Sequence, residues 1–371
     1  MSVLPAVPLF TLSGYLLAAG GASERLVKVF DAVVGWLPGG AAIVTTLVFA
    51  FFTSFTGASG VTILTLGGLL LPVLIRSGYP ESFAVGLITV SGSIGLLFPP
   101  SLPVILYGVN SMQPIDTLFL AGLVPGTLLV LLVSALGVRQ GMAAGAARKP
   151  FSARSAYHAV REAGWELLLP VVVLVGIFGG FATLVEAAAL TVLYAFFVEC
   201  FVYKDLSIRR DLAGVVVDAA ALIGGFLIIL GVALGLTNYL IDAEVPTRLL
   251  DWMQQHIESR AMFLLMLNVF LIGVGAIMDI YSALFVVVPL IIPLGEAYGI
   301  HPVHLGIIFL ANLELGYLTP PMGENLFLSS YRFGHPVLRV FRFTLPFYAV
   351  VAAGVLLITY LPFMTLGLID P

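Results

Sequence analysis

Two short segments of the chain combine paired prolines with small and polar residues. The first is GLLFPPSLP, from Gly95 to Pro103, and the second is GYLTPPMGE, from Gly316 to Glu324. Proline lacks a backbone N–H and disfavours helical geometry in the residue before it, so each pair ends a helix and leaves carbonyl oxygens unpaired. The end of a half-helix presents oxygens suited to a cation, whereas its start presents N–H donors suited to an anion. Both segments therefore predict ion-binding sites.

We expect one Na⁺ site in each region, built from hydroxyl, amide and carbonyl oxygens that suit a hard monovalent cation. The first site is predicted from Ser54, Thr56, Gly57, Ser59, Ser91, Gly92 and Ser93. The second is predicted from Asp279, Ser282, Asn312 and Thr319. Hydroxyls in membrane helices often bond to their own backbone, so each Ser or Thr is equally well explained without a ligand.

For an anionic solute we expect donors after each proline pair, assisted by bound Na⁺. The residues predicted for this role are Pro100, Ser101, Pro321, Met322, Gly323, Glu324 and Asn325. No arginine lies at the predicted midplane, so a bidentate clamp on a carboxylate is not available from the core. Glu324 has two interpretations, a second carboxylate at the site or a side chain that points into a wet cavity.

The composition is that of an integral membrane protein. Of 371 residues, 60% are hydrophobic and 10% are charged, and the mean hydropathy is +1.11. One cysteine and five scattered histidines give neither a disulfide nor a metal cluster. A membrane enzyme is disfavoured because no nucleophile, Walker or dinucleotide motif is present, and we expect no cofactor. A net charge of -4 without a basic domain argues against nucleic acid as a partner.

Two apolar segments are too long to be single spans. Residues 41–75 carry no charge and would extend about 52 Å as one helix, against a hydrocarbon core of about 30 Å. The break TSFTGASG, residues 53–60, divides this segment into arms of about 18 to 22 Å, which predicts a re-entrant hairpin. Residues 261–294 predict a second hairpin, whose break contains the only charge of the segment, Asp279.

Matching residues recur 221 positions apart, which indicates an internal repeat. The matches are Pro72 with Pro293, Gly78 with Gly299, Gly95 with Gly316, and Pro99/Pro100 with Pro320/Pro321. The positive-inside rule places fourteen of the sixteen Lys and Arg residues in the cytoplasm, with only Arg248 and Arg260 outside. The first hairpin then enters from the cytoplasm and the second from outside, so the repeats are inverted, as in many secondary transporters.

The predicted fold is therefore an all-α polytopic membrane protein with two inverted repeats, each containing a re-entrant hairpin and a Pro-Pro-broken helix. The first repeat covers residues 1–138, with its hairpin at 41–75 and its broken helix at 83–110. A basic cytoplasmic loop (139–166) and two scaffold spans (167–210) follow. The second repeat covers residues 211–371, with its hairpin at 261–294 and its broken helix at 305–330.

Four passages resemble the large membrane (M) subunit of tripartite ATP-independent periplasmic (TRAP) transporters. They are TSFTGASG, GGFATLVEAAALTVLYAF (179–196), and the long stretches over residues 75–109 and 275–333. The resemblance implies a Na⁺-coupled importer of organic acid anions, such as C4-dicarboxylates, keto acids or sialic acids, in the bacterial inner membrane. It also implies a periplasmic binding protein, a small four-span membrane subunit and an elevator-type movement of the transport domain.

The chain departs from the family pattern in three places. The first tip reads GASG where more hydroxyls are common, and Glu324 replaces a residue that is usually apolar. Members usually carry about one further apolar hairpin before the position of Met1, so we expect a truncated or naturally short variant whose assembly with the small subunit is open. The alternative function is a stand-alone ion-coupled anion transporter that needs no binding protein. An anion channel would leave the two inverted hairpins unexplained.

Overall fold

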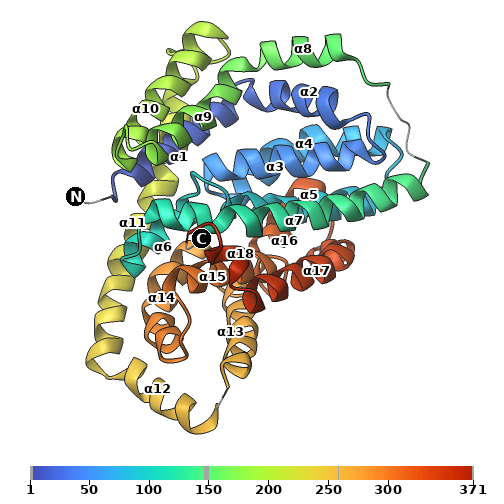
Figure 1. Cartoon of the computed structure of the whole chain (residues 1–371). Helices are drawn as coiled ribbons and strands as arrows, with labels where there is room; N and C mark the ends of the chain where they lie inside the picture. The colour runs from blue at the N-terminus through green and yellow to red at the C-terminus, as the bar shows by residue number, and fades with distance from the viewer. Residues whose placement is uncertain (1–2, 146–149, 258, 370–371) are drawn as a thin grey trace.

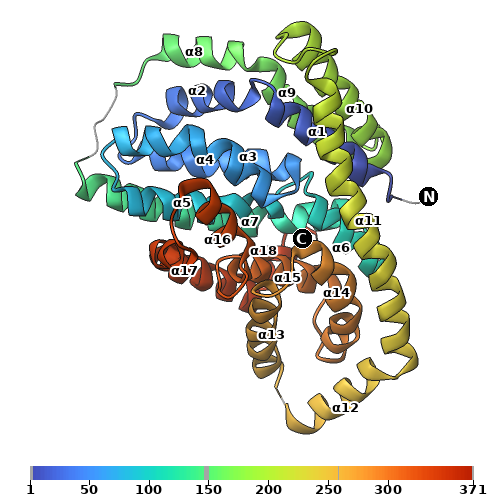
Figure 2. The ribbon, with the colours of Figure 1, turned by 180° about the vertical axis from the view of Figure 1, so that it is seen from behind.

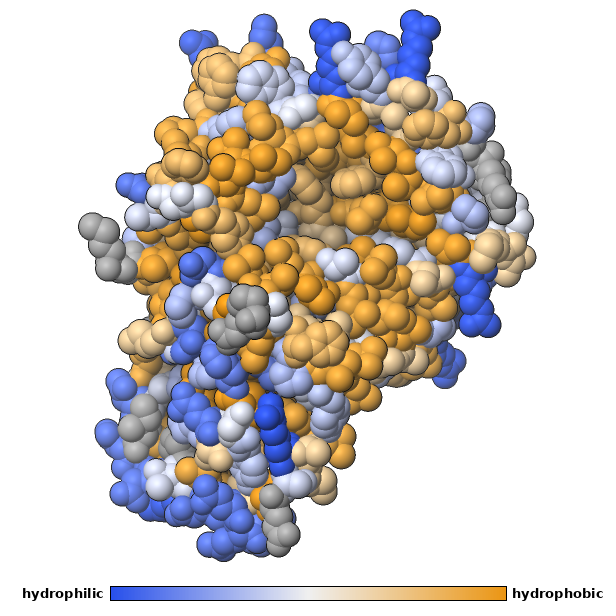
Figure 3. All heavy atoms as spheres, in the orientation of Figure 1, coloured by the Kyte–Doolittle hydropathy of each residue, from blue (hydrophilic) through white to orange (hydrophobic). Residues whose placement is uncertain are grey.

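A computed structural model describes residues 3–145, 150–257 and 259–369, and these residues form helices and connecting turns without strands. Arg148 and Lys149 of the predicted basic loop lie outside the described residues. Six of the described helices are long and apolar enough to cross a membrane, or up to eight if each bent pair is one span. Hydrophobic residues cover the middle of the face in Figure 3, and hydrophilic residues gather toward its top and bottom. The predicted all-α membrane fold is confirmed.

The first repeat contains seven α-helices, and three more connect it to the second repeat. They are α1 (Ala6–Ala19), α2 (Ala22–Val34), α3 (Gly40–Thr56), α4 (Ser59–Arg76), α5 (Glu81–Ile94), α6 (Leu102–Ser111) and α7 (Ile115–Ala143). The connecting helices are α8 (Ala153–Glu162), α9 (Gly164–Phe178) and α10 (Leu184–Phe197), which continues into a π-helical turn, Val198–Val202. Figure 1 shows α8 and α9 beside the first repeat.

The second repeat reproduces the same order of helices. It contains α11 (Leu212–Asp242), α12 (Val245–His256), α13 (Arg260–Gly275), α14 (Ile280–Ala297), α15 (Pro302–Gly316), α16 (Glu324–Phe333), α17 (Val337–Tyr360) and α18 (Phe363–Leu366). Helices α13 to α17 begin 220 to 222 residues after α3 to α7, respectively. Helices of each repeat also pack against helices of the other. Helix α6 packs on α14 and α16 packs on α4, while α5 packs on α17 and α15 packs on α7. The repeats therefore share one interlocked core.

The hairpin arms are longer than the sequence predicts. They contain 17 and 18 residues in α3 and α4, and 16 and 18 residues in α13 and α14, which corresponds to about 24 to 27 Å. The reason is that the first turn uses only Gly57 and Ala58, not the whole TSFTGASG segment. Gly57 has φ 65°, and a Cβ there would lie 2.4 Å from the Leu102 side chain, so the turn requires glycine.

Both proline pairs interrupt a helix, as predicted. Helix α5 ends at Ile94, a 3-10 turn follows, and α6 starts at Leu102 with a bend of 43°. The first turn of α6 contains Pro103, whereas Pro100 lies in the break before it. In the second repeat α15 ends at Gly316 and α16 starts at Glu324. Each break thus leaves seven residues between two half-helices.

An ion cluster joins α2 to the connecting helices. The Arg25 guanidinium donates to carboxylates of Glu166 and Asp205, lies 3.2 Å from the Glu199 carboxylate, and stacks over the Tyr203 ring. Arg25 is 8% exposed, Glu166 1% and Glu199 0%. Buried charges persist only when they are paired, so this cluster fixes α2 against α9 and α10.

Candidate functional site

The two hairpin tips meet in the interior of the molecule. The Tyr281 hydroxyl at the start of α14 donates a hydrogen bond of 2.9 Å to the Gly57 carbonyl at the first tip. The second break closes on the second tip, because the Met322 N–H donates to the Ala276 carbonyl at 2.9 Å and the Ile280 N–H donates to the Tyr317 hydroxyl at 2.7 Å. Figure 2 shows α16, which follows this break, beside α4 of the first hairpin.

A pocket of about 530 Å³, in which two carboxylates and a hydroxyl lie among apolar side chains, opens where the second tip faces α16. Its lining residues are Ile277, Met278, Asp279, Ser282, Met322, Glu324, Phe327 and Leu328. The Glu324 carboxylate also approaches the first hairpin, since a Cβ at Gly60 would lie 3.3 Å from it. The volume is within the range of small-molecule sites, about 300 to 1,000 Å³. Among the described lining residues there is no Lys, Arg or His.

Asp279 and Ser282 are brought together at the start of α14. The Asp279 carboxylate accepts the N–H groups of Tyr281 and Ser282 at 3.0 and 3.2 Å, and it accepts the Ser282 hydroxyl as well. Asp279 therefore caps the helix. A carboxylate has about four acceptor positions, so one remains available to a cation in the pocket.

The residues of the first predicted cation site divide into a cluster and an outlier. Thr53 donates to the Gly92 carbonyl at 2.8 Å and lies 3.1 Å from the Thr62 hydroxyl, and Thr56 lies 3.2 Å from Thr62. Ser93 accepts from Asn325 at 3.2 Å. Ser54 instead donates to the Phe51 carbonyl and lines a separate, mostly apolar pocket.

Two serines of this set show unused bonding capacity. The hydroxyls of Ser59 and Ser91 are buried and have no hydrogen-bond partner among the described residues. Buried polar groups without a partner are rare in folded proteins, so these oxygens favour an occupant such as a cation or water. Sequence reasoning did not select Thr53 and Thr62, although Thr53 belongs to TSFTGASG and Thr62 lies one helical turn beyond Ala58.

The second predicted cation site is not assembled as one group. Asn312 donates to Asn268 at 2.6 Å and to the Ile308 carbonyl at 2.8 Å. Asn268 lies about two helical turns before the tip at Gly275. Thr319 donates to the Leu315 carbonyl at 2.8 Å. Only Asp279 and Ser282 of this set lie in the pocket. The repeat offset locates a residue along its helix, but it does not give the direction of the side chain.

The residues predicted for the anion have different positions. Met322 and Glu324 line the pocket, and Pro321 is exposed. Pro100 is buried, and so is Ser101, whose hydroxyl has no partner among the described residues. Gly323 is required sterically, because a Cβ there would lie 2.5 Å from the Tyr317 carbonyl. Asn325 points away from the pocket and donates to the Thr89 carbonyl at 3.1 Å.

Three of the four half-helices that start near the tips have no side-chain cap at their N-termini. No side-chain cap is present at Ala58, Ser101 or Gly323, which precede α4, α6 and α16. Only α14 is capped, by Asp279. Uncapped N-termini offer N–H donors and partial positive charge, which suits an anion.

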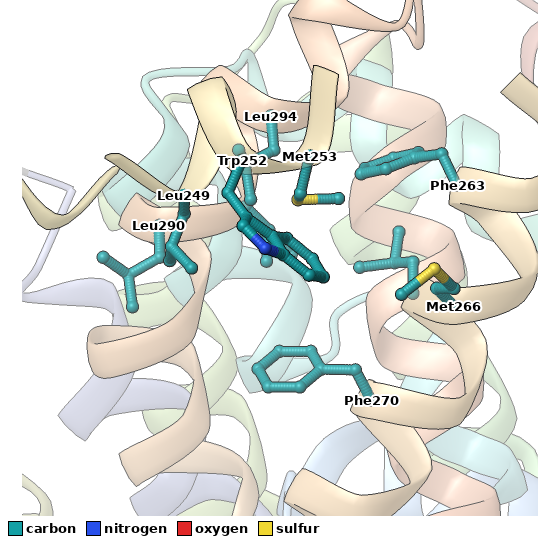
Figure 4. A pocket seen from close by; sticks show the side chains of 10 residues that line it. Leu249, Trp252, Met253, Phe263, Met266, Phe270, Leu290 and Leu294 are labelled. Carbon is teal, nitrogen blue, oxygen red and sulfur yellow. The ribbon is translucent and has the colours of Figure 1, made fainter. Parts of the chain in front are cut away.

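Two further pockets and two acidic residues lie away from the pocket at the second tip. A pocket of about 510 Å³ between α1, α4 and α11 includes Tyr15, Thr65 and Asp218. A pocket of about 200 Å³ under Trp252 of α12 is lined only by apolar side chains and Trp252, so it is unsuited to an organic anion (Figure 4).

Glu186 caps α10 in a capping box with Thr183. Glu314 is 2% exposed, and its oxygens have no partner among the described residues.

Comparison with known proteins gives a consistent result over the whole chain. A family model described as "Tripartite ATP-independent periplasmic transporter, DctM component" matches residues 1–364. The C4-dicarboxylate TRAP transporter large permease protein DctM of Pseudomonas aeruginosa is 33% identical over 366 residues, covering 98% of this chain and 86% of that protein. The sialic acid TRAP transporter large permease protein SiaM of Vibrio cholerae is 33% identical over 331 residues, covering 88% of this chain and 77% of that protein.

A longer relative and a solved structure extend the comparison. The isethionate TRAP transporter permease protein DctMQ of Oleidesulfovibrio alaskensis is 34% identical over 359 residues; the match covers 96% of this chain but 56% of that protein. The crystal structure of the Alcanivorax borkumensis YdaH transporter matches with a TM-score of 0.70 at 14% identity, over 99% of this chain and 86% of that one. At that identity the likeness concerns the fold alone.

Proposed function

Because the chain belongs to the DctM family of tripartite ATP-independent periplasmic (TRAP) transporters, as a large permease subunit and not an enzyme, we propose that it moves organic acid anions across the bacterial inner membrane in symport with Na⁺. The observation that carries this proposal is the junction of the two hairpin tips, Tyr281 on Gly57, beside the pocket that contains Asp279 and Glu324. Irregular backbone at membrane depth is tolerated where it lines a site.

The proposed Na⁺ positions follow from the oxygen atoms at the tips. The first position uses the tip of α3 and α4 with the end of α5, where Ser59 and Ser91 have unpaired hydroxyls. The second uses Asp279 and Ser282 beside the pocket. Oxygen ligands without a thiolate or imidazole suit a hard cation. A bound Na⁺ at each tip would also offset the negative charge of an incoming carboxylate.

The proposed path of transport is a movement of the hairpins and broken helices against the scaffold. We assign the scaffold to α1, α2 and α9 to α12, and the moving part to the interlocked hairpins and half-helices. In this proposal the hairpins enter the membrane from opposite sides, which places their joined tips near the midplane. A TRAP system also includes a small membrane subunit and a periplasmic binding protein, and we propose that both assemble with this chain.

The direct test is uptake by the complete transporter in proteoliposomes. Organic acid uptake should require an inward Na⁺ gradient and should fall to background when choline replaces Na⁺ at constant pH. Uptake that is indifferent to this replacement would contradict Na⁺ coupling. Omission of the binding protein tests the stand-alone alternative, since undiminished uptake without it would support that alternative.

A further inference from the structure

The pocket at the second tip has the wrong charge for a simple dianion. Two carboxylates line it, Asp279 and Glu324, and none of the described lining residues is cationic. The Asp279 charge is offset by the N-terminus of α14 and by the N–H and hydroxyl groups that it accepts. Glu324 also lies at a helix start, as the first residue of α16, but its described hydrogen-bond partner is one tyrosine hydroxyl, so its charge is the less offset of the two.

Glu324 lies at the start of α16, and its described partners are not cations. It interacts with the Tyr317 hydroxyl, and its carboxylate faces Gly60 at the start of α4. Glu324 is half-buried, and partial removal of a carboxylate from water without a cationic partner costs free energy, which a positively charged ligand group would offset. The residue thus favours a ligand with a cationic group over a second negative charge.

An aromatic ring beside Glu324 supports the same conclusion. Phe327 lies three residues after Glu324, on the same face of α16, and it also lines the pocket with 46% of its surface exposed. A carboxylate together with an aromatic face is an arrangement that binds ammonium groups. The methionines of this pocket, Met278 and Met322, add polarizable contacts to such a group.

Donors for the opposite end of a solute lie next to Glu324. Helix α4 has no side-chain cap, and Gly60 in its first turn is the residue that the Glu324 carboxylate faces. Free N–H groups at a helix start bind carboxylate or sulfonate groups. The start of α4 therefore places donors for an anion next to the acceptor that Glu324 offers to a cation.

We propose that the solute is a zwitterion, an organic acid that also carries an ammonium group, and that Glu324 binds this ammonium group. The proposal rests on the proposed transport function and names its substrate class. The anionic end of the solute binds the uncapped start of α4, and its cationic end lies between Glu324 and Phe327. Glu324 is thus a specificity-determining residue, which selects amino or quaternary ammonium acids over dicarboxylates.

The test is ligand binding to the purified permease complex in detergent with Na⁺ present, measured as the rise in melting temperature. The probes are length-matched pairs of zwitterions and dianions, such as 4-aminobutyrate with succinate. Zwitterions should stabilise the wild type more than their dianionic partners. Glu324→Gln should weaken zwitterion binding by about tenfold or more and remove the preference, whereas Glu324→Asp should retain it. Glu296→Gln, an exposed acid at the end of α14, is the matched control and should change nothing.

Several outcomes would overturn the proposal. They are a preference of the wild type for dianions, the binding of neither class, and unchanged zwitterion binding in Glu324→Gln. Uptake in proteoliposomes separates this failure from that of the proposed function. Na⁺-driven uptake of a dicarboxylate would leave the transport function standing and reject the zwitterion, whereas the absence of Na⁺-driven uptake of any organic acid would reject the transport function itself.

Discussion

The two repeats contain equivalent helices in the same order, but they differ in the caps and ion pairs that stabilise these helices. The first hairpin turns on Gly57 and leaves α4 uncapped, whereas the second turns on Asp279, which caps α14. The helices that precede the hairpins, α2 and α12, here called the elbows, differ as well. Arg25 joins α2 to a buried ion cluster, whereas at α12 an exposed Arg248 lies 4.0 Å from Glu244. The two repeats therefore have the same order of helices but differ in charge and in helix capping.

The largest expected effect concerns the two elbows. Arg25→Ala leaves Glu166 and Glu199 buried without their cation, so the free energy of unfolding should fall by about 3 to 5 kcal/mol. Arg248→Ala removes an exposed pair and should cost at most about 1 kcal/mol. Equilibrium unfolding of both variants in detergent measures the difference. Equal losses would show that the buried cluster does not distinguish the elbows.

A smaller effect is expected at the turn of the first hairpin. Gly57→Ala places a Cβ against Leu102 in a left-handed conformation, which should cost about 2 to 4 kcal/mol. Gly299→Ala is the matched control, because Gly299 has φ 67° but no atom within 4 Å of a Cβ. It should cost only about 1 kcal/mol. Thermal melting of the purified proteins compares the two, and similar shifts would mean that contact with Leu102 is unimportant.

The junction between the halves should have the smallest effect on stability. Tyr281→Phe removes the hydrogen bond from the second tip to the Gly57 carbonyl and should cost about 1 kcal/mol. If the junction couples the tips, the same variant should also raise the Na⁺ concentration needed for uptake. Tyr331→Phe, an exposed tyrosine on α16, is the control. Altered stability with unchanged Na⁺ dependence would reduce the junction to a packing contact.

The sequence is informative about backbone breaks and less so about side-chain directions. Charge-free length and paired prolines locate the interruptions, because helix length and proline geometry are local properties. The separation of Asn312 from Asp279 depends on the rotation of α15 against α13, which a repeat offset does not contain. The Arg25 cluster joins segments up to 180 residues apart without a spacing signature, so only the folded chain reveals it. The sequence does show the chemical difference between the tips, since the first tip reads GASG and the second contains Asp279.

The central claim is that the joined tips form the Na⁺-coupled transport site. The most direct test is the Na⁺ concentration that gives half-maximal uptake by the complete transporter, compared between the wild type and Asp279→Asn. Asparagine still caps α14, so the fold should be retained, while loss of the charge should raise the required Na⁺ about tenfold. Asp251→Asn, on the exposed side of α12, should behave as wild type. An unchanged Na⁺ requirement in Asp279→Asn, with the protein correctly folded, would contradict the claim.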